Sequence, residues 1–387
     1  MADTYITQEN LERMAKSASI LLKGNLVAGQ MIQRQVTGVD WNNTGGTAKV
    51  TWAPIGTPTV QDQRIAANRT ALVATSNAEE SQSINVRTLI GERRSLSTYN
   101  STFELNSYTD QVIKPMAAGM AVKVDDFLIN RIAGGFSANE AGVATSNPTT
   151  IAQILAGREA YVNLKGPLDG NLNFLFGSAT EAALLATTQY SSSDYASDAP
   201  TAIKRAMLVD KYGLKHYMSQ AAGIAHDPGV TTGTPLASAG SQTGLTLTVD
   251  GFSTANRYLN RGSRITIAGL SNVYSLAADT EVAADGTASL TFTAALESSP
   301  ADNAAITFAP QFRNVIFHPG GFAGAIIAPP ALPGALSSTQ THDGLSVRLS
   351  VISSLDGSTG AGTDIQMEAY VGGEVLRPEL GVIVGGA

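Results

Sequence analysis

The chain has 387 residues, of which 43% are hydrophobic and 15% are charged. A chain of this length and hydrophobicity can bury a sizeable core in two or more folding units, which excludes a disordered protein. The net charge of −7 disfavours a dedicated nucleic-acid binder, and the absence of cysteine excludes disulfides and thiolate chemistry.

Residues 1–40 predict an N-terminal arm. Apolar residues recur at helical spacing from Asn10 to Val36, with interruptions at Gly24 and Gly29. Each glycine lowers helix propensity by about 1 kcal/mol, so we expect this helical segment to pack against another part of the molecule. The start of the chain lacks a secretory pattern, and no apolar run is long enough to cross a bilayer, so we expect no membrane partner.

Residues 41–97 predict an extended hairpin with little core of its own. Residues 48–52 and 84–87 alternate like strands, and a long polar segment separates them. Such a projection is marginally stable unless it lies on a neighbour. The charged residues near its base are candidate intersubunit contacts, although most charge clusters are simply solvated: Arg87, Glu92, Arg93 and Arg94.

The longest helical period in the chain runs from Ser107 to Gly135. Ser107 and Asp110 form a capping motif, and Pro115 requires the helix either to start near Val112 or to bend. The predicted buried stripe is Ile113, Met116, Met120, Val124, Phe127 or Leu128, and Ile132.

Two adjacent carboxylates, Asp125 and Asp126, lie within this helix. Neighbouring residues of a helix point about 100° apart, so the two side chains cannot form a catalytic dyad. We expect them on a solvated face.

Residues 151–224 predict a mixed α and β unit. Thr150 with Gln153, and Ser178 with Glu181, have the spacing of capping boxes before two helices, and residues 173–176 predict a short buried strand between those helices. A further helix is expected after Pro200.

Residues 225–308 differ from what precedes them. Short alternating strands at 245–249, 264–267, 273–276 and 289–293 are separated by turn residues, with no helical period. This pattern favours a small β-barrel inserted into the host domain. Beyond it, residues 314–317 predict a strand, and residues 347–351 and 365–371 predict a closing β-hairpin.

The sequence contains no motif that predicts catalysis. Phosphate-binding, zinc-protease and serine-hydrolase signatures are absent, and the four histidines share no metal-binding spacing: His216, His226, His318 and His342. We expect no catalytic residue, no cofactor and no metal, and therefore no enzyme.

Three motifs resemble one protein family. Residues 344–348 (GLSVR), 370–373 (YVGG) and 376–380 (LRPEL) resemble the C-terminal signature of tailed-phage major capsid proteins. Residues 314–318 with Phe322, and residues 264–270 in the insertion, resemble the coat proteins of short-tailed Salmonella phages. The order of the predicted parts agrees with this group.

The resemblance implies an α+β fold of the Hong Kong 97 type with an inserted β-barrel. Its parts would be an arm (1–40), an extended loop (41–97), a peripheral domain with a spine helix (98–150 and 344–387), an axial domain (151–224 and 309–343) and the insertion (225–308). The core of the spine helix would be the stripe given above, with Phe127 and Leu128 both included.

The resemblance also implies a function and partners. Hexamers and pentamers of the chain would form an icosahedral shell, assembled in the host bacterial cytoplasm with a scaffolding protein and a portal ring. The shell would enclose double-stranded DNA without reading its sequence. Scaffolds of this group use basic helical ends, so the acidic residues of the arm, Asp3, Glu9 and Glu12, are candidate scaffold contacts.

Two alternatives remain open. The first is the shell of an encapsulin-like bacterial compartment, which has the same fold. The second is a glycan-binding surface protein with β modules, which would need a secretion signal and an exposed aromatic platform.

Overall fold

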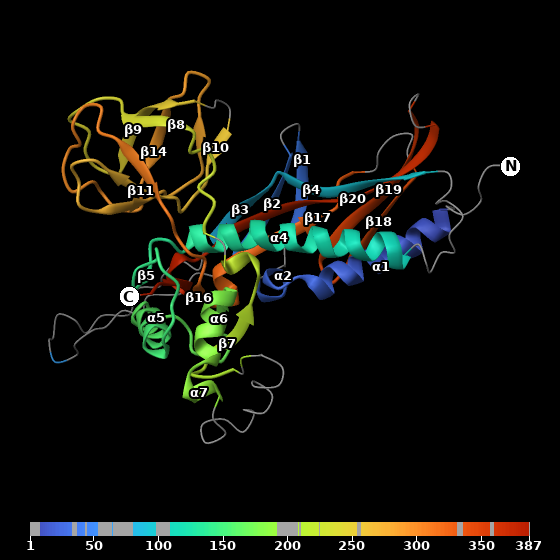
Figure 1. The fold of residues 1–387 in the computed structure, drawn as a ribbon, viewed down its shortest axis with the longest axis horizontal. Coiled ribbons are helices and arrows are strands. Elements are labelled where there is room, and N and C mark those ends of the chain that lie inside the picture. The colour runs from blue at the N-terminus through green and yellow to red at the C-terminus, as the bar shows by residue number, and fades with distance from the viewer. Residues whose placement is uncertain are drawn as a thin grey trace.

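The computed structural model describes residues 8–32, 37–42, 45–52, 64, 80–97, 109–191, 208, 210–223, 225–253, 257–330, 336–356 and 360–386. A long body of helices on a sheet carries two smaller units at one end, a rounded β unit on one side and an α/β unit on the other (Figure 1). No described helix is both long and apolar enough to span a bilayer.

The body contains a five-stranded sheet in the order β18-β19-β17-β20-β4. Its strands are β4 (Thr88–Ser97), β17 (Phe322–Ile327), β18 (Leu336–His342), β19 (Leu345–Asp356) and β20 (Gly360–Val375). The antiparallel pairing of β19 with β20 confirms the predicted closing hairpin. The long helices of the body pack on one face of this sheet.

The long helix α4 (Lys114–Gly135) lies across this sheet, preceded by one π-helical turn at Thr109–Ile113. The α-helix begins at Lys114, and Pro115 is its second residue, directly after the π-helical turn. The predicted stripe is buried at Ile113, Met116, Met120, Val124, Leu128 and Ile132, and Phe127 is half-buried. The predicted cap Ser107 lies outside the described residues.

The arm packs against α4 and the edge of the long sheet. It consists of α1 (Gln8–Asn25) and α2 (Ala28–Met31), so the helix breaks between the two glycines that the sequence singled out. Its apolar face joins the main core, which contains Leu11, Met14, Leu22 and Met31 together with the buried face of α4.

The α/β unit has a second five-stranded sheet, in the order β5-β21-β16-β6-β7. Its strands are β5 (Glu140–Ala141), β6 (Asn173–Phe176), β7 (Lys215–Met218), β16 (Val315–Phe317) and β21 (Gly381–Val384). Its helices are α5 (Ile151–Asn163), α6 (Ser178–Leu185) and α7 (Thr188–Ser191). Single 3-10 turns at Ala221–Gly223, Pro319–Gly321 and Pro378–Leu380 connect its strands to the rest.

The two capping predictions for this unit have different outcomes. Thr150 and Gln153 form a complete capping box at α5. The box at Ser178 and Glu181 is wrong, because Ser178 is already the first residue of α6 and Gly177 is the N-cap. The Gly177 N–H donates to Asn314 Oδ1 at 3.2 Å. Asn314 directly precedes β16, so its side chain fixes the position of the N-terminus of α6. The helix expected after Pro200 begins outside the described residues.

The sheets divide the C-terminal part of the chain differently from the predicted domains. Strands β17 and β18, within the segment 309–343 predicted for the axial domain, pair with β19 and β20 of the long sheet. Strand β21, predicted for the peripheral domain, pairs with β16 and β5. Strand pairing is non-local, so sequence order did not reveal these exchanges.

The insertion is an all-β unit around its own core. Its strands are β8 (Gly233–Ala237), β9 (Thr246–Phe252), β10 (Arg257–Leu259), β11 (Arg264–Ile267), β12 (Val273–Ser275), β13 (Thr280–Val282), β14 (Ala288–Thr291) and β15 (Ile306–Ala309). They form the sheets β12-β11-β15, β14-β9-β8 and β10-β13. Single bridges, Leu236 with Ala305 and Leu276 with Phe292, join the two three-stranded sheets at both sides.

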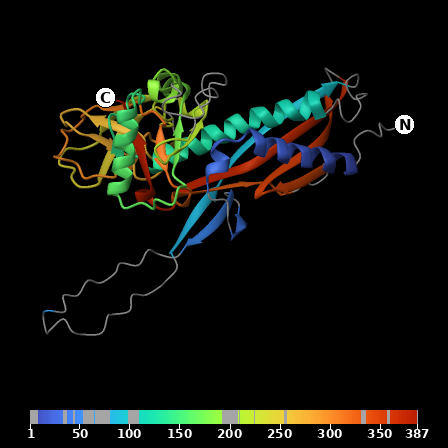
Figure 2. The same cartoon turned by 90° about the horizontal axis from the view of Figure 1, so that it is seen from below.

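The extended hairpin forms a separate three-stranded sheet, β1-β2-β3, that stands out from the body (Figure 2). Its strands are β1 (Thr37–Asn42), β2 (Gly45–Trp52) and β3 (Glu80–Val86). Ala48, Val50, Ile84 and Val86 are buried against residues of β17 and against Leu376. The antiparallel pairing of β2 with β3 confirms the two predicted strands.

Candidate functional site

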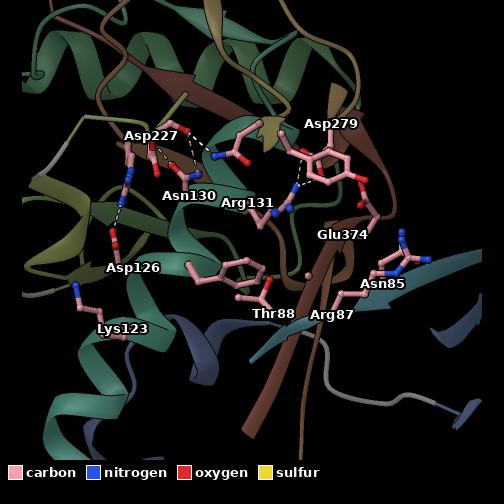
Figure 3. Close-up of a pocket in the computed structure, with 15 residues that line it drawn as sticks. Asn85, Arg87, Thr88, Lys123, Asp126, Asn130, Arg131, Asp227, Asp279 and Glu374 are labelled. Atoms are coloured by element: carbon pink, nitrogen blue, oxygen red, sulfur yellow. Dashed lines mark hydrogen bonds and ion pairs between the residues drawn. The ribbon is translucent and has the colours of Figure 1, made fainter. Parts of the chain in front are cut away.

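A cleft of about 560 Å³ lies where the insertion and α4 meet the junction between strands β3 and β4. Its walls carry polar and charged side chains from segments far apart in the chain, as Figure 3 shows. The lining residues within 85–88 come from the junction of β3 and β4, and those within 123–131 come from α4. Residues 227, 258, 260 and 279 belong to the insertion. Two aromatic rings, Phe127 and Tyr258, also line it.

Most charges of the cleft are paired within the chain. Arg131 of α4 donates to Asp279 of the insertion at 2.6 Å, and Arg313 donates to Asp126 at 2.5 Å. Glu374, at the end of β20, pairs with Arg261 of the insertion. The Arg131–Asp279 and Glu374–Arg261 pairs join the insertion to the body, whereas the Arg313–Asp126 pair lies within the body.

Arg87 and Lys123 are different. Both are exposed, and neither forms an ion pair or hydrogen bond within the described part of the chain. Figure 3 places them on the same lower side of the cleft, on either side of Thr88. Two cations that have no ion-pair partner among the described residues, in a chain of net charge −7, can receive a carboxylate from outside.

The other predicted intersubunit residues do not gather in this cleft. Arg93 on β4 donates from Nε to Asp364 on β20 at 3.0 Å. Arg94 donates to Glu92 at 2.7 Å on the same strand. These side chains stabilise the sheet edge, so Arg87 is the one member of the predicted set that faces the cleft.

The predicted scaffold residues have weak local partners. Glu9 accepts from Arg13 at 2.5 Å, one helical turn away, and both side chains are largely exposed. Glu12 accepts from Gln8 at 3.3 Å. Asp3 lies outside the described residues.

Asp125 is a residue whose role the sequence reasoning missed. It is 4% exposed, not solvated, and its carboxylate accepts from the backbone N–H groups of Val27 at 2.8 Å and Ala28 at 2.9 Å. Burial raises its pKa to about 6, although these hydrogen bonds act in the opposite direction. Asp125 therefore ties the arm to the long helix, while Asp126 holds the buried Arg313.

The four histidines are separate from one another. His216 Nε2 lies 3.0 Å from the Tyr190 hydroxyl, His318 lies 3.2 Å from Asp169, and His226 is buried at the base of the insertion. The described residues contain no group of three His, Asp or Glu side chains placed to hold a metal ion. Burial lowers the pKa of His216 to about 4.

Comparison with known proteins gives matches only at the level of structure. No protein-family model matches the sequence, and no curated protein matches it. A structure from Mycobacterium phage Che8 is similar over 92% of this chain and 90% of its own, with 12% identity and a TM-score of 0.45.

Two further solved structures are similar over most of the chain. The capsid structure of cyanophage P-SCSP1u covers 92% of this chain and 86% of its own, with 10% identity and a TM-score of 0.40. A virus-like particle from Pyrococcus furiosus covers 97% of this chain and 98% of its own, with 8% identity and a TM-score of 0.42. Phage capsid structures are thus among those to which this chain is similar.

Proposed function

We propose that the chain is the major capsid protein of a tailed phage, and that many copies form an icosahedral shell around double-stranded DNA. Support comes from the sequence motifs at the C-terminus and in the insertion. The arrangement of parts also supports it: an arm along a long helix, a helix-covered sheet, an α/β unit, an inserted β-barrel and a projecting hairpin. In this scheme the body is the peripheral domain and the α/β unit is the axial domain.

The observation that carries the proposal is the projecting sheet β1-β2-β3. It stands away from the body in Figure 2, and among the side chains of β2 and β3 that the structure describes, the buried apolar ones are Ala48, Val50, Ile84 and Val86. A hairpin with so little core gains stability when it lies on another surface. In a shell, that surface is the neighbouring subunit.

Deleting Thr57–Ala78 tests this role. The variant should remain folded, because the four buried side chains of β2 and β3 all lie outside the deleted range. We expect it to sediment as a subunit or small oligomer under conditions where the wild-type chain forms shells in the electron microscope.

Two results would contradict the proposal. Shells formed by the deletion variant would show that the hairpin is not an intersubunit element. A wild-type chain that stays monomeric with and without a scaffolding protein would refute the shell function itself.

The cleft supplies a second contact in this proposal. Arg87 and Lys123 are exposed and form no ion pair with the residues that the structure describes, and other copies of this acidic chain offer carboxylates. We assign these two side chains to the binding of an acidic segment from a neighbouring subunit.

The proposal includes a scaffolding protein and a portal ring, with assembly in the host cytoplasm and the finished shell in the virion. Glu9, Glu12 and Asp3 would bind basic ends of the scaffold. Attraction between exposed charges weakens as the Debye length falls to about 3 Å at 1 M salt, so this contact would be reversible. Scaffold incorporation into particles should fall in the Asp3→Asn, Glu9→Gln, Glu12→Gln variant, and unchanged incorporation across a salt series would assign the site elsewhere.

A further inference from the structure

The projecting sheet β1-β2-β3 has two edge strands, which differ in what lies against them. Strand β3 lies against β20 of the body, where a Cβ atom added at Gly372 would be 2.6 Å from the Asn85 carbonyl oxygen and 3.0 Å from Val86 Cγ2. Strand β1 pairs with β2 on one side, and no other strand of the described part of the chain pairs with it. The β1 edge of the sheet is therefore open.

The two edges of the long sheet are protected in different ways. Strand β18 lies beside the arm, where Gln8 Nε2 donates to the Ser337 carbonyl at 3.3 Å. Strand β4 carries the charged residues Glu92, Arg93 and Arg94 in succession. A covering helix and charged side chains both hinder an edge strand from pairing with another chain. Strand β1 contains neither lysine nor proline and has a single charged residue, so it is the least protected of these four edges.

The register of β1 shows which of its residues bond to β2. Asn42 is opposite Gly45 with two residues between them, the spacing at which the first carbonyl of a β-turn accepts from the last N–H. Asp40 is opposite Thr47, two residues further along each strand. Hydrogen-bonded pairs alternate along an antiparallel ladder, so Asn42 and Asp40 bond to β2.

The residues between these positions face outward. The N–H and carbonyl groups of Val39 and Trp41 point away from β2, because successive residues of a strand turn their backbone groups to opposite sides. The register shifts between Thr37 and Val39, so the regular part of β1 begins at Val39. An open row of such groups is a template for a strand from another chain.

A second copy of this chain fits this edge best. The sheet stands away from its own body in Figure 2, and none of the described strands of that body pairs with β1. Strand addition is held by main-chain hydrogen bonds and needs an extended segment more than a particular side chain. Identical copies are the chains at the highest local concentration in a shell, and the hairpin that carries β1 is the proposed intersubunit element.

We propose that β1 binds an extended segment of a neighbouring copy by strand addition, through the outward N–H and carbonyl groups of Val39 and Trp41. This inference rests on the proposed shell function and specifies how the hairpin of one subunit is held by the next. A main-chain contact of this kind tolerates a change of side chain at Val39 but not the loss of its N–H.

Hydrogen exchange read out at single residues tests the pairing. In the free subunit the amides of Asp40 and Asn42 should be protected, whereas those of Val39 and Trp41 should exchange fast. In shells from which the scaffolding protein has been removed, exchange at Val39 and Trp41 should slow on the order of tenfold or more, with a much smaller change at the other two. Burial of the whole hairpin without strand pairing would slow all four amides alike.

A matched pair of variants tests the same contact through assembly. Val39→Pro removes one outward N–H at an edge position that accepts proline, and Val39→Thr keeps it. The proline variant should stay folded and give on the order of tenfold fewer shells, while the threonine variant should assemble like the wild type. If the proline variant does not fold, the exchange pattern of the wild-type chain decides.

Several results would overturn the proposal. Shells in which Val39 and Trp41 exchange as fast as in the free subunit would exclude strand addition and leave the shell function intact, as would shells formed normally by a folded Val39→Pro variant. Protection already present in the free subunit would mean that the chain covers its own edge, and protection only with scaffold bound would make the scaffold the occupant. A wild-type chain that forms no shells would refute the proposed function and this inference together.

Discussion

The insertion and the projecting hairpin are both β-structure outside the helix-covered body, but they bury apolar surface in different ways. The insertion's core residues all come from residues 230–306. Among its described side chains the hairpin buries Ala48, Val50, Ile84 and Val86, and it needs β17 and Leu376 to cover them. The first region carries its own stability, whereas the second depends on its neighbours.

The largest expected effect is a loss of stability in the body that leaves the insertion unaffected. Met120 is 2% exposed in the middle of α4, so Met120→Asp places an unpaired charge in the main core and should destabilise the body by about 3–5 kcal/mol. Thermal unfolding should show an earlier transition for the body, with the insertion's transition unchanged. Val122→Asp, at a position 51% exposed on the same helix, is the control. A melting temperature equal to that of the wild type would show that this face of α4 is not the buried one.

The comparison can also be tested with fragments. Residues 225–308 expressed alone should give dispersed amide resonances, because their core is internal. Residues 45–86, the β2–β3 hairpin, should give the narrow spectrum of an unfolded peptide. A collapsed spectrum for the insertion fragment would mean that its ion pairs with the body are needed for folding.

A smaller effect concerns the contact between the arm and α4. The pKa of Asp125 is raised from 3.8 to about 6, so the folded protein binds this proton more tightly than the unfolded chain. Its contribution to stability is therefore fully present below about pH 4 and is lost as the pH rises through 6. Relative to Asp125→Asn, the wild-type chain should gain up to about 3 kcal/mol of unfolding free energy between about pH 7 and pH 4.

Denaturant unfolding at several pH values would measure this difference. The neighbouring variant Asp126→Asn separates the effects of the two carboxylates, since Asp126 pairs with Arg313 and Asp125 accepts hydrogen bonds from the arm. A constant difference between wild type and Asp125→Asn across this pH range would show that Asp125 titrates normally and that the arm does not bury it.

The smallest effect on folding is expected at the cleft. Arg87 and Lys123 have no partner among the described residues, so Arg87→Glu with Lys123→Glu should change the unfolding free energy by no more than about 0.5 kcal/mol. Assembly should nevertheless be lost if these cations bind a neighbouring subunit, as light scattering would detect. Lys165→Glu, at an exposed position away from the cleft, should assemble normally. Normal assembly of the double variant would remove the cleft from the set of subunit contacts.

Local patterns in the sequence determined much of the secondary structure. The stripe from Ile113 to Ile132 is buried, since a helical period depends only on nearby residues. The capping box at Thr150 needs only residues three apart, and it formed. Four strands of the insertion, β9, β11, β12 and β14, were predicted for the same reason, whereas β8, β10, β13 and β15 were not predicted.

The sequence alone did not identify the partners of buried polar groups. Asp125 has the pattern of a solvated residue, but the arm packs over it and supplies two N–H donors. Arg348 and Glu368 are likewise buried as a pair across β19 and β20, with Arg348 Nε donating to Glu368 at 2.8 Å. Such a pair is stable in the interior only because each charge meets the other, a condition set by strand register.

What the sequence by itself determined is therefore a large part of the helices and strands, the separate insertion and the family that the chain resembles. The tertiary structure alone decided how the C-terminal strands are shared between two sheets, where the arm is attached and which cations of the cleft have no ion pair within the described part of the chain. The physical reason is the separation along the sequence of the residues that interact. Helical and strand periods are read from neighbouring residues, whereas the pairing of Asp126 with Arg313 joins residues 187 positions apart, and only the folded chain brings them together.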